Sequence, residues 1–413
     1  MDNSYRFPIS FWTTVSMKDC VFDGSDRDEA VRWRDLGITV AMSPTCGEGD
    51  EPEVKAMLDR CAEFGIKVII CDGRAGWRYY QKVGEDEYRK TFADLLAEYG
   101  SYPALFGFFV GDEPDAADAA DAFAVSRIQN EMAPGLTAYL NLLPWFDWIA
   151  ERIGSKSYGA YLDRAAKESG GKLLSYDCYT NAWGRRGYDT YFNNLREHSE
   201  QVRRNGVPFW NIVLSCGHYE YQNPTQNDLW WEVSTSVTCG AAGVSYFFIR
   251  LPRIMENYHR AAINMLNERT PQFAELSEVN RTFQQSVGCQ MDGLVIDRLY
   301  AVGESWGGIE MFKPFGSVLD VRSNYADAPL LFSHFTGRDG GSYYAVCNNT
   351  PLRSTYAGMR FKKNVKLSFA QFGGGWQTMP THGDPVGERL TTPGESCGVW
   401  LAPGRMMLIK EEK

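Results

Sequence analysis

Carboxylates that follow short apolar segments are the residues of this sequence best suited to chemistry. Asp112 and Glu113 follow the apolar run 105–110 after Gly111, and Asp177 comes directly after 172–176. A carboxyl group that is buried beside another carboxylate keeps its proton near neutral pH, because desolvation and like charge both disfavour ionisation. Such a group can protonate a leaving oxygen. We therefore predict Glu113 to be a general acid. The alternative is that the Asp-Glu-Pro-Asp segment only caps the helix that follows.

A general acid of this kind works with a second carboxylate, and two residues are candidates for it. Glu220 is the leading candidate and lies a few residues after the apolar segment 207–215. The alternative for Glu220, to which we give similar weight, is an ordinary glutamate on a surface loop. Asp177 is the rival candidate for the same role.

Polar and aromatic residues near the ends of other apolar segments complete the candidate site. The residues that we predict to bind substrate are Asp72, Asp112, Asn141, Tyr179, Trp183, His218, Tyr246 and Trp12. Asp72 has the equally weighted alternative of capping a turn, and a lone histidine such as His218 is more often structural. The carboxylates are scattered and no H-E-x-x-H motif accompanies them, so we expect neither a metal nor a cofactor.

The elements that must position these residues alternate regularly over the first two thirds of the chain. The expected strands are 8–14, 38–43, 66–71, 105–110, 136–142, 172–176, 207–215 and 243–249. The expected helices are 26–37, 51–64, 85–99, 116–132, 158–169, 188–205, 226–238 and 258–283. Eight strand–helix units predict a (β/α)₈ barrel, in which the candidate residues meet at the C-terminal ends of the strands. An open doubly wound sheet is the alternative, and the lack of G-x-G-x-x-G after any strand disfavours it.

The last part of the chain has a different pattern. From residue 299 onward, short alternating segments are separated by glycine-rich turns, and Asp339-Gly340-Gly341 indicates a hairpin turn. We therefore predict two units: a catalytic barrel at 1–288 and a small antiparallel β-sandwich at 289–413.

Composition excludes several classes of partner. The 413 residues carry a formal net charge of −10, which argues against nucleic acid and against an anionic membrane surface. The chain holds 12 Trp, 22 Tyr and 23 Phe, a supply that suits stacking on sugar rings. No basic and apolar leader begins the sequence, so we expect a cytoplasmic protein. The ten cysteines include no C-x-x-C pair, and we expect buried free thiols.

One motif resembles a known group of enzymes. Val110-Gly111-Asp112-Glu113-Pro114 is similar to the Asn-Glu-Pro signature of clan A glycoside hydrolases. The segments 139–144 and 175–179 resemble β-galactosidase-like and related bacterial carbohydrate-active barrels. The resemblance implies that Glu113 is the acid/base and that a glutamate at the end of strand seven, here Glu220, is the nucleophile. The chain departs from the pattern in two places. Asp112 replaces the Asn that contacts the sugar 2-hydroxyl, which indicates a different hydrogen-bonding need or an amino sugar, and strand seven does not end on Glu.

The activity that the resemblance implies is hydrolysis of oligosaccharides or glycosides, with a carbohydrate substrate and retention as the expected outcome. Carboxyl groups ~5–5.5 Å apart would indicate retention, and ~6.5–9.5 Å would indicate inversion. The alternative function is a non-catalytic carbohydrate-binding protein on the same barrel. A lyase or isomerase ranks third, because no metal cluster, strand-end lysine or phosphate-binding turn is evident.

Overall fold

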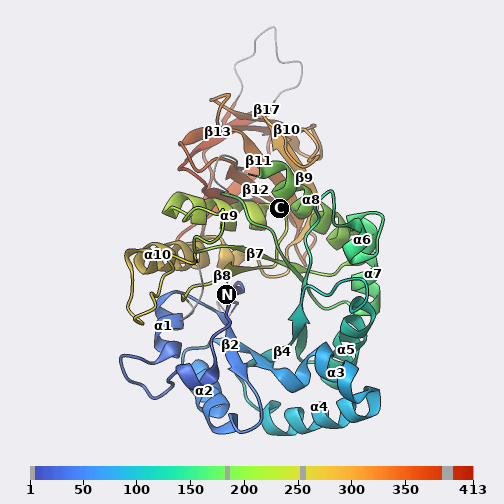
Figure 1. The fold of residues 1–413 in the computed structure, drawn as a ribbon. Helices are drawn as coiled ribbons and strands as arrows, with labels where there is room; N and C mark the ends of the chain where they lie inside the picture. Colours follow the sequence, from blue (N-terminus) through green and yellow to red (C-terminus); the bar gives the residue numbers. More distant parts are fainter. Residues whose placement is uncertain (1–4, 182–186, 252–256, 384–393, 413) are drawn as a thin grey trace.

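A parallel barrel forms the first part of the molecule (Figure 1). The computed structural model describes residues 5–181, 187–251, 257–383 and 394–412. Within these residues, eight parallel strands pair in the order β1-β8-β7-β6-β5-β4-β3-β2. The strands are β1 Ile9–Trp12, β2 Val40–Cys46, β3 Lys67–Asp72, β4 Leu105–Asp112, β5 Thr137–Leu142, β6 Leu174–Asp177, β7 Phe209–Leu214 and β8 Gly243–Phe247. The predicted (β/α)₈ barrel is confirmed.

The barrel closes between β1 and β2 through a short seam. The Ile9 amide donates to Thr39 Oγ1 at 2.7 Å, and the Thr39 amide donates to the Ile9 carbonyl at 2.9 Å. Further along, the Thr45 amide donates to the Val15 carbonyl at 2.8 Å. These bonds hold β1 beside β2, so the C-terminal ends of both strands lie at the same rim as those of the other six strands.

Helices surround the barrel, and their ends follow local capping signals. The helices are α1 Glu29–Asp35, α2 Glu51–Glu63, α3 Trp77–Val83, α4 Glu85–Tyr99, α5 Ala119–Met132, α6 Ala150–Ile153, α7 Tyr158–Glu168, α8 Tyr188–Asn205, α9 Gln226–Thr238 and α10 Pro271–Ser286. Single-turn 3₁₀ helices are η1 Met17–Asp19, η2 Gly73–Ala75 and η3 Gly288–Gln290. The Asp28 side chain caps α1, which therefore begins later than the predicted residue 26.

One expectation about helices is wrong, and one helix was not expected. The helix predicted at 85–99 is confirmed as α4, but α3 precedes it between β3 and β4. The last barrel helix was expected from residue 258 but begins at Pro271, because proline suits the first helical turn and Thr270 occupies the N-cap position. The described residues between β8 and α10, 248–251 and 257–270, form no helix.

Aromatic rings fill the interior of the barrel below the strand ends. Trp12 on β1 meets Phe109 on β4 with ring centroids 5.3 Å apart, and Tyr139 on β5 meets Trp210 on β7 at 5.6 Å. Gly243 on β8 leaves room for the indole ring, since a Cβ there would lie 2.4 Å from Trp210 Nε1. The rim residues thus rest on a packed floor.

Two antiparallel sheets form the C-terminal part. Within the described residues their orders are β10-β13-β17-β16 and β15-β14-β18-β12-β11-β9. The strands are β9 Val295–Val302, β10 Val318–Ser323, β11 Leu330–Thr336, β12 Ser342–Asn348, β13 Thr355–Lys362, β14 Lys366–Ala370, β15 Trp376–Thr378, β16 His382–Gly383, β17 Gly394–Leu401 and β18 Met406–Glu412. The hairpin predicted at 339–341 is confirmed, because β11 pairs with β12 in antiparallel register.

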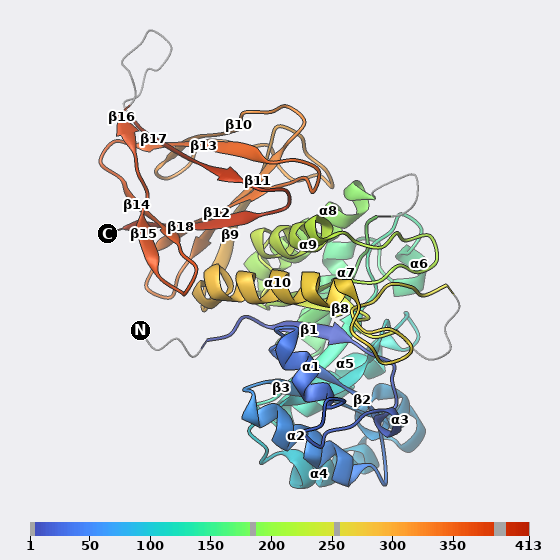
Figure 2. The ribbon, with the colours of Figure 1, turned by 90° about the vertical axis from the view of Figure 1, so that its left-hand side faces the viewer.

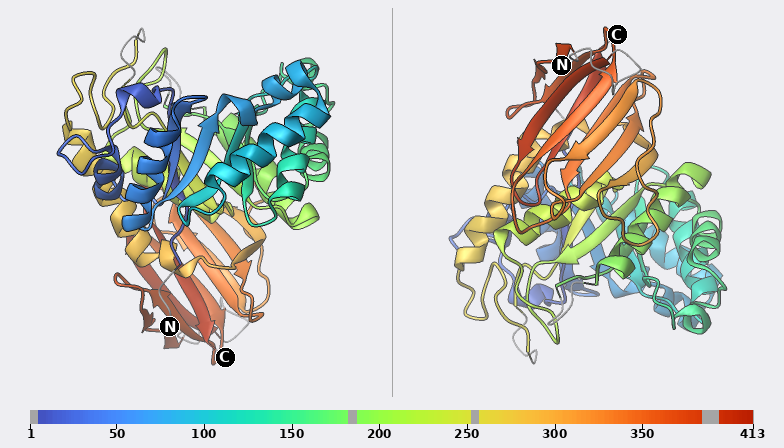
Figure 3. Two further views of the ribbon diagram at one scale, coloured as in Figure 1. Left: turned by 90° about the horizontal axis from the view of Figure 1, so that it is seen from below. Right: turned by 90° about the horizontal axis from the view of Figure 1, so that it is seen from above.

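The sheets pack against one side of the barrel, next to α8, α9 and α10 (Figures 2 and 3). Trp231 Nε1 on α9 donates to Asn349 Oδ1 at 2.9 Å, and the Arg405 guanidinium lies 3.4 Å from the centre of the Trp230 ring. Every residue of α9 from 228 to 238 is buried. The helix therefore serves as core for the barrel on one side and for the sheets on the other.

Two chemical properties follow from the described residues. None of their helices combines the length and apolar character needed to cross a membrane. All ten cysteines fall within the described ranges and are free thiols, eight of them buried.

Candidate active site

Asn141 at the end of β5 links carboxylates from the two neighbouring strands. Its side-chain nitrogen donates to Asp112 Oδ1 of β4 at 3.0 Å and to Asp177 Oδ1 of β6 at 2.8 Å. Its side-chain oxygen accepts from Ser175 Oγ at 3.2 Å, and Ser175 in turn contacts the Tyr139 hydroxyl at 3.0 Å. Because the amide oxygen is occupied by Ser175, both N–H groups are directed at the carboxylates.

Glu113 follows β4 in an unusual backbone conformation. Its φ is 47°, in the left-handed region that non-glycine residues rarely occupy, and its amide donates to the Asn141 carbonyl at 2.9 Å. The preceding Gly111 has φ 151°, and a Cβ there would lie 1.7 Å from the Trp77 ring. The chain thus turns sharply at the strand end and brings the Glu113 side chain within hydrogen-bonding reach of Asp177.

The surroundings of Glu113 favour its protonated form. Burial, followed by the charges of Asp177 and Asp112, raises the pKa of Glu113 to about 8. Arg152 opposes this rise, with its Nη2 3.7 Å from Glu113 Oε2. The Glu113 side chain remains 31% exposed, so a molecule in solution can reach it.

Asp177 has a similar but more balanced environment. Burial and the neighbouring Asp112 raise the pKa of Asp177 to about 7, while hydrogen bonds from Asn141 and Tyr179 favour the ionised form. Burial also raises the pKa of Asp112, and Asn141 counteracts it. Since Glu113 and Asp177 lie so close together, they titrate as a pair that holds one proton near neutral pH.

Aromatic rings from the loops after β6, β7 and β8 form a wall beside the pair. His218 lies parallel to Tyr258, with centroids 5.2 Å apart and planes inclined by 9°, and it also contacts Phe247 at 4.7 Å. Tyr179 meets His218 at 5.7 Å and hydrogen-bonds to Asp177. Burial lowers the pKa of His218, so the imidazole is neutral at physiological pH.

Of the two candidates for the second carboxylate, Asp177 is close enough to Glu113 for its charge to raise the Glu113 pKa. Glu220 is exposed on the loop that follows β7. Asp72 ends β3, and both of its oxygens are occupied: the carboxylate caps η2 by accepting from the Arg74 amide at 2.8 Å and forms a 2.7 Å ion pair with the Arg74 guanidinium. This arrangement matches the capping alternative for Asp72.

One predicted substrate-binding residue points away from the rim cluster. Tyr246 points toward α10, where its hydroxyl donates to Asn280 Oδ1 at 2.7 Å, because side chains alternate along β8 and Ser245 takes the inward direction. Trp12, the last residue of β1, is 8% exposed and packs its ring against Phe109. Trp183 lies outside the described residues.

The sequence analysis missed Arg152 and Tyr258. Arg152 belongs to α6, a helix of four residues, which is too short to show a hydrophobic period. Tyr258 was assigned to a helix and lies instead in the loop between β8 and α10.

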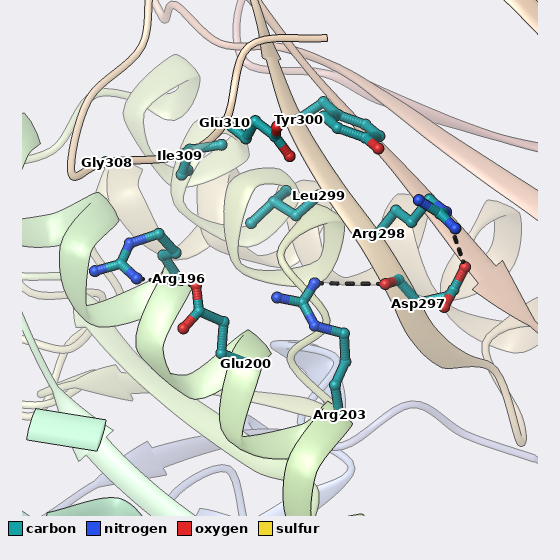
Figure 4. A pocket seen from close by; sticks show the side chains of 10 residues that line it. All are labelled: Arg196, Glu200, Arg203, Asp297, Arg298, Leu299, Tyr300, Gly308, Ile309 and Glu310. Carbon is teal, nitrogen blue, oxygen red and sulfur yellow. Dashed lines mark hydrogen bonds and ion pairs between the residues drawn. The ribbon is translucent and has the colours of Figure 1, made fainter. Parts of the chain in front are cut away.

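A separate cavity of about 240 Å³ lies between α8 and β9, away from the strand ends (Figure 4). Its charged groups neutralise one another: Arg196 pairs with Glu200 at 2.9 Å, and Arg298 pairs with Asp297 at 3.3 Å. In the part of the chain that the structure describes, no group of three or more His, Cys, Asp or Glu side chains has an arrangement that could hold a metal ion.

Solved structures of other proteins share the fold of this chain at low sequence identity. No protein-family profile and no curated sequence matches the chain. A solved structure described as a glycoside hydrolase is 12% identical, with TM-score 0.53, and covers 98% of this chain and 92% of its own. A glycoside hydrolase family 5 structure from Bacteroides vulgatus is 11% identical, with TM-score 0.54, covering 98% of this chain and 89% of its own. A β-galactosidase from the psychrophilic Marinomonas ef1 is 11% identical with TM-score 0.48, and the match spans 67% of this chain and 59% of that enzyme. The chain therefore has the (β/α)₈-barrel fold, followed by antiparallel sheets, that it shares with glycoside hydrolases.

Proposed function

We propose that the chain is a glycoside hydrolase that cleaves a glycosidic bond in oligosaccharides or glycosides, with Glu113 as the general acid and Asp177 as its ionised partner. The observation that carries the proposal is the juxtaposition of these carboxyl groups at the ends of β4 and β6, with pKa values raised to about 8 and about 7. One proton shared by the pair at neutral pH is the protonation state that acid catalysis with an ionised partner requires.

The substrate takes over the hydrogen bond between the two groups. In the free protein Glu113 has Asp177 within hydrogen-bonding reach, and the glycosidic oxygen replaces Asp177 as the acceptor of the Glu113 proton. As the bond breaks, Asp177 supplies negative charge to the oxocarbenium-like centre, and Asn141 and Tyr179 keep that charge on Asp177.

The stereochemical outcome depends on how far the substrate separates the pair. Carboxyl groups ~5–5.5 Å apart give retention, whereas a separation of ~6.5–9.5 Å leaves room for a water molecule and gives inversion. The anomeric configuration of the first product, followed by NMR, distinguishes retention from inversion.

The test is hydrolysis of a panel of nitrophenyl α- and β-glycosides by the wild type and by E113Q, D177N and E220Q, each checked for native folding by circular dichroism. On the glycoside that is cleaved, E113Q and D177N should each lower kcat/KM at least ~10²-fold, whereas E220Q should match the wild type. A comparable loss in E220Q, with D177N active, would make Glu220 the partner. Full activity of E113Q on a substrate with a poor leaving group would refute the role of Glu113.

The same panel tests the alternative function. A non-catalytic carbohydrate-binding protein would cleave none of the glycosides and would still bind sugar.

A further inference from the structure

The loop between β5 and α6 presents an exposed tryptophan at the rim of the barrel. Trp148 is 68% exposed, and its ring stacks on Phe146 with centroids 5.5 Å apart and planes inclined by only 3°. Phe146 supports one face of the indole ring. The free face of the indole ring offers an apolar surface on which another molecule can stack.

Specific contacts hold this loop in place. The Asn194 side chain on α8 accepts from the Trp145 amide at 2.7 Å and donates to the Trp145 carbonyl at 3.0 Å. Ile149, the residue after Trp148, is completely buried. Trp148 is therefore presented by a fixed segment, which reduces the conformational entropy that binding would cost.

The same segment leads directly to the candidate acid. Arg152, four residues after Trp148, has its Nη2 3.7 Å from Glu113 Oε2. The Ile153 amide donates to the Ile149 carbonyl at 3.1 Å, so one helical turn separates the tryptophan from the arginine. The Arg152 carbonyl also accepts from the Ala116 amide at 2.7 Å, which fixes α6 to the loop after β4.

The chemistry around Trp148 suits a sugar ring. Asp147 and Glu151 are both exposed on the same segment and offer carboxylate oxygens that accept hydrogen bonds from hydroxyl groups. A pyranose has an apolar C–H face, which matches the indole ring, and hydroxyl groups at its edge, which match the carboxylates. Two nearby negative charges disfavour an anionic ligand.

We propose that Trp148 is a stacking platform for a sugar unit next to the one cleaved at Glu113, so that the substrate is an oligosaccharide rather than a monosaccharide glycoside. This inference rests on the proposed function for the position of the cleaved bond. The binding of the sugar unit itself depends only on Trp148 and its neighbours.

The experiment measures binding with catalysis disabled. E113Q, E113Q/W148A and E113Q/W400A are titrated by isothermal calorimetry with cellohexaose, laminarihexaose, mannohexaose, xylohexaose and chitohexaose. Trp400 on β17 is the matched control, because it is 61% exposed and belongs to the C-terminal sheets. We expect W148A to weaken the binding of at least one hexasaccharide 10-fold or more, and W400A to leave it unchanged.

Three results would overturn the proposal: equal affinity with and without Trp148, an equal loss in the W400A protein, or no binding of any of the five hexasaccharides to E113Q. Failure of the glycosidase assignment has a separate signature, since neither the wild type nor E113Q would then cleave any glycoside, whatever the binding result. In a protein with activity, W148A should also lower kcat/KM for the hexasaccharide, whereas W400A should leave it unchanged.

Discussion

Replacing Glu113 by glutamine should stabilise the folded protein at alkaline pH. A carboxyl group whose pKa is higher in the folded than in the unfolded chain stabilises the fold below its unfolded pKa, and this stabilisation is lost as the pH rises through the folded pKa. For Glu113 these limits are 4.5 and about 8. The wild type therefore loses stability between these pH values, and E113Q lacks the contribution that Glu113 makes to this loss.

The magnitude follows from the two pKa values. Their difference corresponds to at most ~5 kcal/mol, at ~1.4 kcal/mol for each tenfold change in the proton affinity. Solvent access to a side chain that is 31% exposed reduces this figure, as does sharing of the proton with Asp177. We expect E113Q to exceed the wild type by ~1–3 kcal/mol at pH 9 and to equal it within ~0.5 kcal/mol at pH 4.

The assay is urea unfolding followed by tryptophan fluorescence at pH 4, 6.5 and 9, with the free energy of unfolding obtained by linear extrapolation. E220Q is the control, because Glu220 is exposed and its replacement should change the stability little at any of the three values. A difference between E113Q and the wild type that is the same at pH 4 and pH 9, or that has the opposite sign at pH 9, would refute the electrostatic reasoning. The experiment needs no substrate.

The remaining predictions concern the pH profile of kcat/KM and the packing of the barrel. R152Q removes the cation that lies 3.7 Å from Glu113, so the pKa of Glu113 should rise and the alkaline limb of the profile should move to higher pH. An unchanged alkaline limb would show that Arg152 does not affect the pKa of Glu113. N141L removes the N–H donor that lies 2.8 Å from Asp177 Oδ1, and the loss of this hydrogen bond raises the pKa of Asp177. The acidic limb of the profile should therefore move to higher pH, and the maximum of kcat/KM should fall. A shift of the acidic limb to lower pH would contradict the described hydrogen bonds. The side chain added in G243V would overlap the Trp210 ring, because a Cβ at position 243 would lie 2.4 Å from Trp210 Nε1. Urea unfolding should show that the free energy of unfolding falls by ~2–4 kcal/mol, and a fall below ~0.5 kcal/mol would show that the ring moves freely.

The barrel could be predicted from the sequence because its strands are short apolar runs between amphipathic segments. The meeting of Glu113 and Asp177 also follows from that pattern, since both residues end strands whose C-terminal ends share one rim. The sequence did not reveal that the Tyr246 side chain points toward α10 and away from the barrel interior. A strand that is buried on both faces has no alternation of polar and apolar residues, so the pattern does not show which residues point inward.

Other parts of the site depend on contacts that no local pattern encodes. The link through Asn141 joins three strands and becomes visible only when their register is known. Helix α6 and its Arg152 escape a periodicity analysis because four residues make a single turn. The loop after β8 was assigned to a helix, although the signal for the helix start, Thr270 followed by Pro271, stands twelve residues further on than the predicted start at 258.

The burial of α9 on both sides determines how the molecule unfolds. If the C-terminal sheets detached, Trp230 and Trp231 would face water and lose Arg405 and Asn349 as partners. If the barrel opened first, the sheets would lose the surface on which they pack. Neither half has a low-energy state without the other, so a calorimetric scan should show one cooperative transition in which both parts melt together.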